Sequence, residues 1–251
     1  MPIQFRLLNR RITLLYGPDI ILGLFKKSKE VAAEHWLVQV LVNAFGVEPS
    51  DAPFYLKDDT GISNQPAPRS NDVPAEHRIF YLVYKSIHVG LSGDRLDEMS
   101  RQLIRNVSTQ LGQQSFTEEW TDVPDLYQPF IRKICFKAGI VSLCGSKILE
   151  VIPTFVEDFW TFDYHVPTLF KEVPSWLAPN AFSARDTMKQ NVQKWHDYAH
   201  AHYDVDEGED DPRHWEEYFG TRMMRTRHAF FKKMPLSKST VAADDLGLIW
   251  A

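Results

Sequence analysis

The final stretch of the chain, residues 237–251, constrains the fold more than any other. Ser239 or Thr240 can cap a helix by accepting a backbone hydrogen bond. Four large apolar side chains then follow almost without interruption: Leu246, Leu248, Ile249 and Trp250. Each loses about 1.5–3 kcal/mol if it stays in water, and the sum rivals the net stability of a domain, about 5–15 kcal/mol. The stretch therefore predicts a buried helix, covered either by another part of this chain or by a part that the chain lacks.

Composition and charge exclude several classes of protein. The 251 residues include 44% hydrophobic and 13% aromatic side chains, which favours a large apolar core. The net charge of −5 argues against a general nucleic-acid surface, which would be basic. Cys135 and Cys144 are too few for a disulfide framework. We find no apolar run long enough to span a membrane and no signal peptide, so the chain is predicted to be soluble and cytoplasmic.

The pattern of apolar residues predicts a mainly α fold with a small N-terminal β-hairpin. The hairpin covers residues 3–16, with its turn at Asn9-Arg10, and helices follow over 18–25 and 32–45. One partial domain is expected over residues 1–251. It comprises the hairpin and first helices (1–46), a long loop rich in Pro, Asp and Ser (47–74), a helical body (75–236) and the final helix (237–251).

Three local signals give sharper expectations within the helical body. Pro153 and Pro167 are expected to break the segment 147–170 into pieces, because proline cannot donate a helix hydrogen bond. Ser183 with Asp186 resembles a capping box, which predicts that a helix starts there. Residues 215–231 are predicted to form one further helix.

Two groups of polar residues contain the side-chain types that bind metal ions. The acidic segment 204–211 lacks the EF-hand spacing, because Gly208 falls one position early. His196 and His200 stand four residues apart and can hold zinc on one helix face. No third ligand stands where a metalloprotease would need it, so no metal site is predicted.

Five segments in their order along the chain carry a resemblance to a known family. They are Gly17-Pro18-Asp19-Ile20-Ile21, residues 90–96, residues 159–163, residues 173–177 with Ala184-Arg185-Asp186, and residues 239–251. Taken together, the chain resembles the N-terminal half of a fungal-type cytochrome P450. The last segment is similar to the start of the long central helix that passes over the haem in this family.

The resemblance implies an incomplete haem-thiolate monooxygenase. The family oxidises hydrophobic small molecules, in secondary metabolism among other pathways, with haem, dioxygen and electrons from a reductase. Its cysteine ligand, its Glu-x-x-Arg helix and the oxygen-activating part of the central helix are expected beyond Ala251. The family is usually anchored to the endoplasmic reticulum, and we find no such anchor here. A truncated, inactive chain is therefore expected, with no catalytic, cofactor-binding or metal residue of its own and no bound haem.

Two near-matches to family motifs fall inside the chain. Phe136, Gly139 and Cys144 resemble the family's cysteine loop, but Cys144 comes one residue late and abuts Gly145. A buried helix end explains this segment. Glu98-Met99-Ser100-Arg101 matches Glu-x-x-Arg, but the pattern is short, and an exposed pair three residues apart explains it.

The resemblance also suggests a remnant of a substrate pocket. The candidate lining residues are Phe159, Phe162, Trp176, Leu177, Leu246 and Ile249. The simpler interpretation is that they are ordinary core side chains. Two alternatives to an inactive enzyme remain open. One is a helical interaction protein that binds an unknown partner through the apolar C-terminal end; the other is a gene-model fragment of an active monooxygenase.

Overall fold

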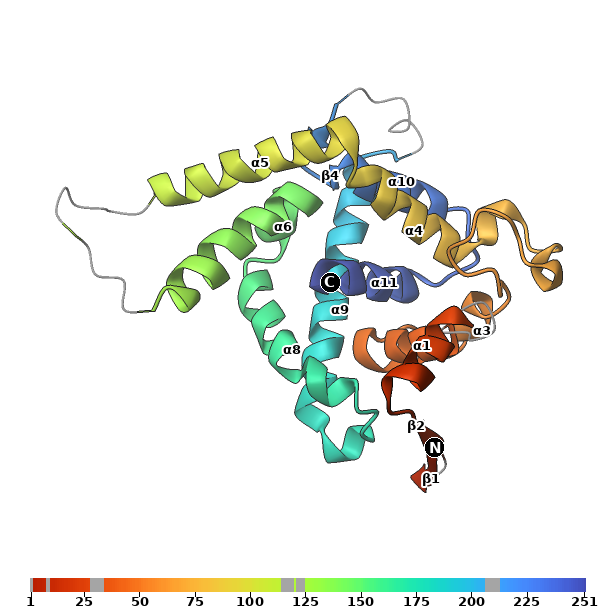
Figure 1. The fold of residues 1–251 in the computed structure, drawn as a ribbon. Helices are drawn as coiled ribbons and strands as arrows, with labels where there is room; N and C mark the ends of the chain where they lie inside the picture. The colour runs from red at the N-terminus through yellow and green to blue at the C-terminus, as the bar shows by residue number, and fades with distance from the viewer. Residues whose placement is uncertain (1, 8–9, 28–33, 114–119, 121–124, 206–212) are drawn as a thin grey trace.

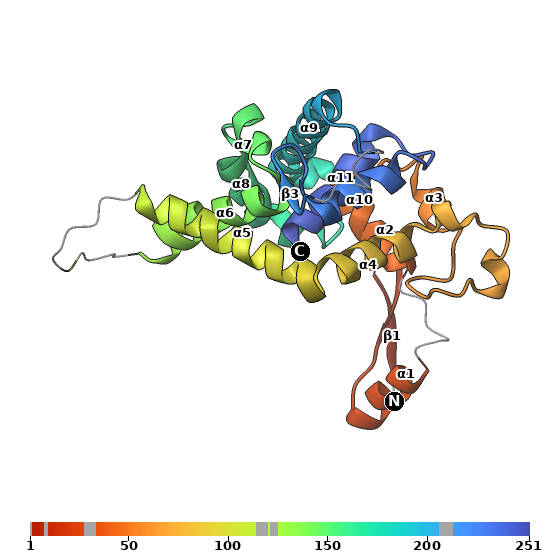
Figure 2. The ribbon, with the colours of Figure 1, turned by 90° about the horizontal axis from the view of Figure 1, so that it is seen from above.

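The computed structural model describes all residues except 1, 8–9, 28–33, 114–119, 121–124 and 206–212. It confirms a mainly α fold with a small antiparallel hairpin at its start. Strands β1 (Ile3–Leu7) and β2 (Arg10–Leu14) pair with Phe5 opposite Ile12. Arg10, expected in the turn, opens β2, and Asn9 lies outside the described residues. Helix α1 (Pro18–Lys26) follows, and Figure 2 shows it projecting from the body with the hairpin.

The helix predicted over residues 32–45 is present, but it changes from an α-helix to a π-helix. Helix α2 (Glu34–Val40) continues directly into the π-helix η2 (Leu41–Phe45), and Gly46 ends it at φ +86°. A backbone in this region suits glycine, because a Cβ atom would be strained there. The wider π turn belongs to the segment that carries Phe45 into the core.

The predicted long loop is ordered by its own contacts. It contains α3 (Ala52–Tyr55) and the 3₁₀ turns η3 (Pro68–Ser70) and η4 (Ala75–His77). The buried Arg78 pairs with Asp58 at 3.2 Å and donates to the carbonyl oxygens of Ser63 and Asn64. The Arg78 guanidinium thus holds three positions of the loop together.

The helical body is made mostly of helices, which range from the short α7 to the long α9. Figure 1 shows α5 and α6 side by side, α9 running behind α11, and α10 beside α4. The elements are α4 (Ile79–Gly90), α5 (Gly93–Gly112), η5 (Tyr127–Cys135), α6 (Phe136–Cys144), α7 (Lys147–Val151), α8 (Phe155–Leu169), η6 (Ser175–Leu177), α9 (Pro179–His202), α10 (Arg222–Phe231) and α11 (Lys238–Trp250).

Four local expectations are corrected by this structure. Pro167 lies inside α8, in its last turn, and the helix continues past it to Leu169. Helix α9 already begins at Pro179, so Ser183 and Asp186 lie inside it and form no capping box. Helix α11 is capped by Ser237, whose hydroxyl accepts from the Thr240 N–H at 3.2 Å, and not by Ser239 or Thr240.

The fourth correction concerns residues 215–231. The segment starts with the short strands β3 (Trp215–Glu216) and β4 (Gly220–Thr221), and only then becomes helix α10. The Glu216 carboxylate accepts from the backbone N–H groups of Tyr218 and Phe219, which stabilises the turn between the strands. A side chain that bonds the backbone locally competes with the helix.

The apolar C-terminal stretch is covered by the chain itself. Leu246 is fully buried, Ile249 is buried, and Leu248 and Trp250 are half-buried. Helix α11 packs against α9 and η2, and its C-terminal end lies near the middle of Figure 1. The structure therefore does not support the alternative in which the apolar C-terminal end is exposed and binds a partner. None of the helices in the described part of the chain is long and apolar enough to cross a membrane.

Candidate functional site

The structure divides the six candidate pocket residues into two groups. Phe159 and Phe162 on α8 and Leu246 and Ile249 on α11 belong to the buried core. Trp176 and Leu177 lie in η6, where their exposed fractions are 76% and 58%. These two side chains do not join the other four, because the turn after α8 carries them to the surface.

Phe45 links the buried candidates to the N-terminal helices. Its ring centroid lies 6.2 Å from that of Phe162 and 5.8 Å from that of Trp250. The Trp250 indole N–H donates to Asp163 at 3.0 Å. Gly247 lies directly over the Phe45 ring, since a Cβ atom at this position would be 3.6 Å from it. Aromatic contacts of this kind fix the spacing between η2, α8 and α11.

An apolar cleft opens on the other side of Phe45, between α2–η2, α4 and α11. It has a volume of about 280 Å³. Its apolar lining consists of Leu37, Val40, Leu41, Phe45, Ile79, Phe80, Val83, Ile87 and Leu248. Three polar residues, Tyr55, Arg227 and Asp244, reach it as well. Of the six candidates, none lines this cleft; the apolar spacing within 37–45 and 79–87 was the available signal for it.

The polar end of the cleft is a buried charge cluster that sequence analysis missed. The Arg227 guanidinium donates to Asp244 at 2.8 Å and to Asp245 at 2.9 Å. The Tyr55 hydroxyl donates to the second oxygen of Asp244 at 3.0 Å. All four side chains are buried, so two carboxylates share one guanidinium in the interior of the protein. Buried charges need such partners, because losing hydration is costly.

The environment separates the pKa values of the two carboxyl groups. Burial raises the pKa of Asp244, and the Arg227 charge offsets this only in part. Burial acts in the same direction on Asp245, but Arg227 and the neighbouring His196 and His228 hold the pKa of that carboxyl well below its usual value. Burial and the nearby Asp244 raise the pKa of Tyr55 well above its usual value, so it keeps the proton it donates. Asp245 is consequently the firmly ionised group of the cluster.

Two histidines contact Asp245, and a third histidine contacts one of them. The Nε2 atoms of His196 and His228 lie 3.2 and 3.1 Å from Asp245 Oδ2. His200 Nε2 lies 3.1 Å from His228 Nδ1. Burial and the neighbouring His196 lower the pKa of His228 to about 3, which leaves this imidazole neutral at neutral pH. The helical pair His196 and His200 is thus divided: His196 contacts Asp245, and His200 contacts His228.

The surroundings of Cys144 do not fit the haem ligand that the family resemblance implies. Cys144 is fully buried at the end of α6, as expected for a buried helix end. Burial, and then the nearby Asp245, raise the pKa of this thiol well above its usual value, whereas an iron ligand must be a thiolate. Cys135 is half-buried in η5. Cys144 as the structure places it therefore does not fit a thiolate ligand of haem.

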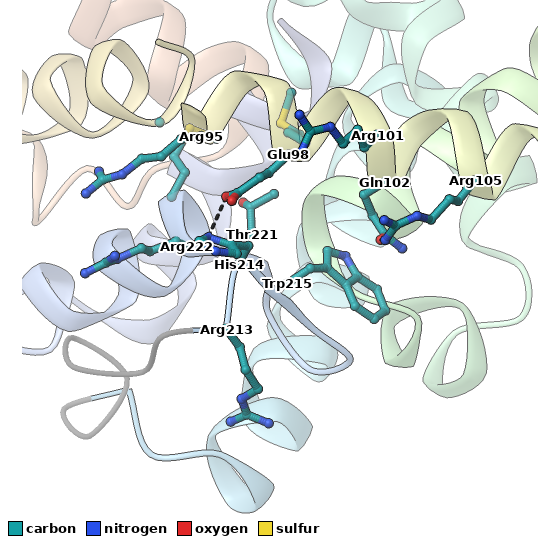
Figure 3. Close-up of a pocket in the computed structure, with 13 residues that line it drawn as sticks. Arg95, Glu98, Arg101, Gln102, Arg105, Arg213, His214, Trp215, Thr221 and Arg222 are labelled. Atoms are coloured by element: carbon teal, nitrogen blue, oxygen red, sulfur yellow. Dashed lines mark hydrogen bonds and ion pairs between the residues drawn. The ribbon is translucent and has the colours of Figure 1, made fainter. Parts of the chain in front are cut away.

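A second cavity, of about 450 Å³, lies between α5 and the β3–β4 region. Figure 3 shows that the arginines around it, such as Arg95, Arg105 and Arg213, point in different directions and do not converge. Its central ion pair joins Glu98 to His214. The Glu-x-x-Arg near-match is corrected here, since the partner of Glu98 is His214 and not the residue three positions on. We assign no ligand to this cavity.

The helical architecture and the sequence comparisons together define the class of protein. This chain is cytochrome P450-like and corresponds to part of a cytochrome P450. No protein-family profile matches it. It is 33% identical to the cytochrome P450 monooxygenase fsoE of Humicola fuscoatra, over 72% of this chain and 31% of that protein. Identity to the monooxygenase efuG of Hormonema carpetanum is 26%, over 100% of this chain and 42% of the relative.

A third relative also matches nearly all of this chain but less than half of its own length. The chain is 24% identical to the cytochrome P450 monooxygenase calL of Penicillium decumbens, over 96% of this chain and 44% of that protein. The chain thus spans less than half the length of the curated fungal relatives it matches. The activity, substrate and partners of those whole proteins enter below as proposals.

Proposed function

We propose that this chain supplies a substrate-binding part of a cytochrome P450-type monooxygenase, and that its apolar cleft binds a hydrophobic small molecule. The observation that carries this is the cleft itself, which is walled by aliphatic and aromatic side chains from three helical segments. Sites of this composition, with a few convergent polar groups, are typical of small-molecule binding. Tyr55 and Asp244 at the polar end would orient a ligand hydroxyl group by accepting a hydrogen bond from it.

The size of the cleft limits the ligand. Its volume of about 280 Å³ lies just below the usual range for ligand pockets, about 300–1,000 Å³. We infer that it holds one apolar portion of a substrate. The rest of a larger molecule would extend past Ala251, which also lines the cleft.

Oxidation is not assigned to residues 1–251 alone. The burial of Cys144 supports the proposal that this chain is inactive by itself and retains no haem. Haem, an electron-donating reductase and the thiolate ligand belong to the activity proposed for a longer protein of this family.

Binding of 1-naphthol to the purified 251-residue chain tests the cleft. We expect saturable binding in calorimetry, weakened about tenfold or more by Val83→Trp, because the indole would fill the space between α4 and α11. Val89→Trp is the matched control, since Val89 lies on the same helix with its side chain exposed. Absence of binding, or equal affinity in the Val83 variant, would refute the proposed cleft.

A further inference from the structure

Asp245 and the two histidines that contact it, His196 and His228, place one possible ligand atom each at the spacing of metal ligands. Asp245 Oδ2 lies 3.2 Å from His196 Nε2 and 3.1 Å from His228 Nε2, and the ligand atoms of the three residues all lie within 4.8 Å of one another. Zinc bonds of about 2.0–2.1 Å in a tetrahedral site place neighbouring ligand atoms about 3.3 Å apart. The two distances from Asp245 Oδ2 are within a few tenths of an ångström of that value, and the ligand atoms of the two histidines lie within 4.8 Å of each other.

Hydrogen bonding does not account for these contacts. Despite the short distances, His196 Nε2, His228 Nε2 and Asp245 Oδ2 have no hydrogen-bond partner among the residues that the structure describes. Buried polar atoms without partners are rare and costly, so three together call for a missing partner.

The charge of the cluster favours a cation as that partner. Asp244 and Asp245 bring two negative charges when ionised, and Arg227 brings one positive charge, which is directed at Asp244 and at the other oxygen of Asp245. One guanidinium cannot balance two ionised carboxylates, so one negative charge remains without a counter-ion in a buried place. A divalent cation beside Asp245 Oδ2 supplies the missing positive charge.

The surroundings provide support and access for such an ion. His200 Nε2, 3.1 Å from His228 Nδ1, fixes the orientation of the His228 ring in the way that outer partners orient metal-bound histidines. A cavity of about 600 Å³ reaches His196, His200 and His228 from the surface. A solvent molecule can therefore occupy a fourth ligand position.

We propose that His196 on α9, His228 on α10 and Asp245 on α11 form a binding site for a zinc-type divalent cation, which joins the three helices. Two imidazoles and one carboxylate suit Zn²⁺ and exclude Mg²⁺, which prefers oxygen ligands. This site is separate from the apolar cleft, since Arg227 and Asp244 lie between them.

Calorimetric titration of the EDTA-treated 251-residue chain with Zn²⁺ tests the site. We expect one equivalent to bind with micromolar or tighter affinity, and no heat with Mg²⁺. His228→Gln and His196→Gln are expected to weaken zinc binding at least tenfold. His202→Gln is the matched control, because His202 lines the same cavity but contacts the Tyr198 carbonyl oxygen, and its affinity should stay within twofold.

X-ray absorption at the zinc edge keeps the test independent of how well the variants fold. The unaltered chain with one equivalent of Zn²⁺ should show two imidazoles and at least one oxygen ligand. A spectrum without imidazole scattering, a chain that binds no zinc, or a folded His228→Gln chain with unchanged affinity would each overturn the proposal.

Discussion

Arg227 shows how one side chain supports the interior of this molecule. Its guanidinium is fully buried and contacts both Asp244 and Asp245. Arg227→Met keeps much of the volume but leaves the two carboxylates without their cation. We expect the free energy of unfolding to fall by about 3–5 kcal/mol, the usual cost of breaking a buried ion pair. Urea denaturation followed by circular dichroism measures this loss.

The matched control is an ion pair at the surface. Lys238 and Asp197 approach to 2.6 Å, but the side chains are 79% and 47% exposed. Lys238→Met should therefore change the free energy of unfolding by at most about 1 kcal/mol. A loss at Arg227 as small as that at Lys238 would mean that the buried charges are not firmly coupled.

Close packing of two backbones joins α6 to the β3–β4 hairpin. Gly145 and Gly220 both have positive φ, at +87° and +66°. A Cβ atom on Gly220 would lie against the backbone of Leu143 and Gly145, closer than real Cβ atoms come. Gly220→Ala is expected to reduce the free energy of unfolding by about 2–4 kcal/mol, from strain and overpacking combined. Thermal and urea unfolding give the measurement.

Gly139 provides the contrasting case within α6. A Cβ atom there would meet nothing within 4 Å, and the residue lies in the middle of the helix. Gly139→Ala should raise the free energy of unfolding by about 0.5–1 kcal/mol, because alanine loses less backbone entropy. Equal effects at Gly139 and Gly220 would contradict the close approach described here.

Glu48 connects the segment after η2 to two other elements. Its carboxylate accepts from Ser239 on α11 at 2.6 Å and contacts Lys189 on α9 at 3.1 Å. The Ser239 hydrogen bond, then the one from Lys189, lower the pKa of Glu48 from its ordinary value of 4.5. A lowered pKa stabilises the fold above the unfolded-state value and loses this effect as the pH falls through the folded-state value.

Comparison of Glu48→Gln with the unaltered chain over pH tests this connection. The difference in unfolding free energy should stay constant down to about pH 5 and shrink below it. Because the Glu48 side chain is 38% exposed, we expect a difference below about 1 kcal/mol. Urea midpoints at a series of pH values measure it; a difference that does not shrink in acid would rule out the stabilising contacts.

At the scale of the whole molecule, the placement of the cysteines predicts the behaviour towards haem. The 251-residue chain mixed with haemin, reduced and treated with carbon monoxide should give no absorption band of a thiolate-ligated haem. The reason is that Cys144 is buried and protonated at the end of α6. Cys144→Ser and Cys135→Ser should leave the spectrum unchanged. A thiolate band that disappears in either variant would show that a cysteine of this chain ligates iron.

Part of the fold could be predicted because each helix carries its own apolar period. The hairpin and most helices follow local patterns, and the family resemblance rests on their order. The failures have local causes: Glu216 bonds to the backbone after it and turns the expected helix into a hairpin. Likewise, Pro167 fits the last turn of α8 and does not end the helix before it.

The candidate site was less predictable, because its residues are far apart in the chain. Phe159, Phe162, Leu246 and Ile249 could be selected as buried from their apolar surroundings, whereas Trp176 and Leu177 have similar side chains but lie in an exposed turn. Sequence cannot distinguish these cases when the deciding factor is what covers the side chain.

Residues 237–251 by themselves determined that a helix must be buried, since water cannot accommodate four large apolar side chains at low cost. Only the tertiary structure decided what covers it and what its polar residues do. Asp244 and Asp245 are adjacent in sequence but face different neighbours: Tyr55 on one side, His196 and His228 on the other. Helix geometry turns successive residues by about 100°, so the packing of α3, α9 and α10 around α11 gives each carboxylate its own environment.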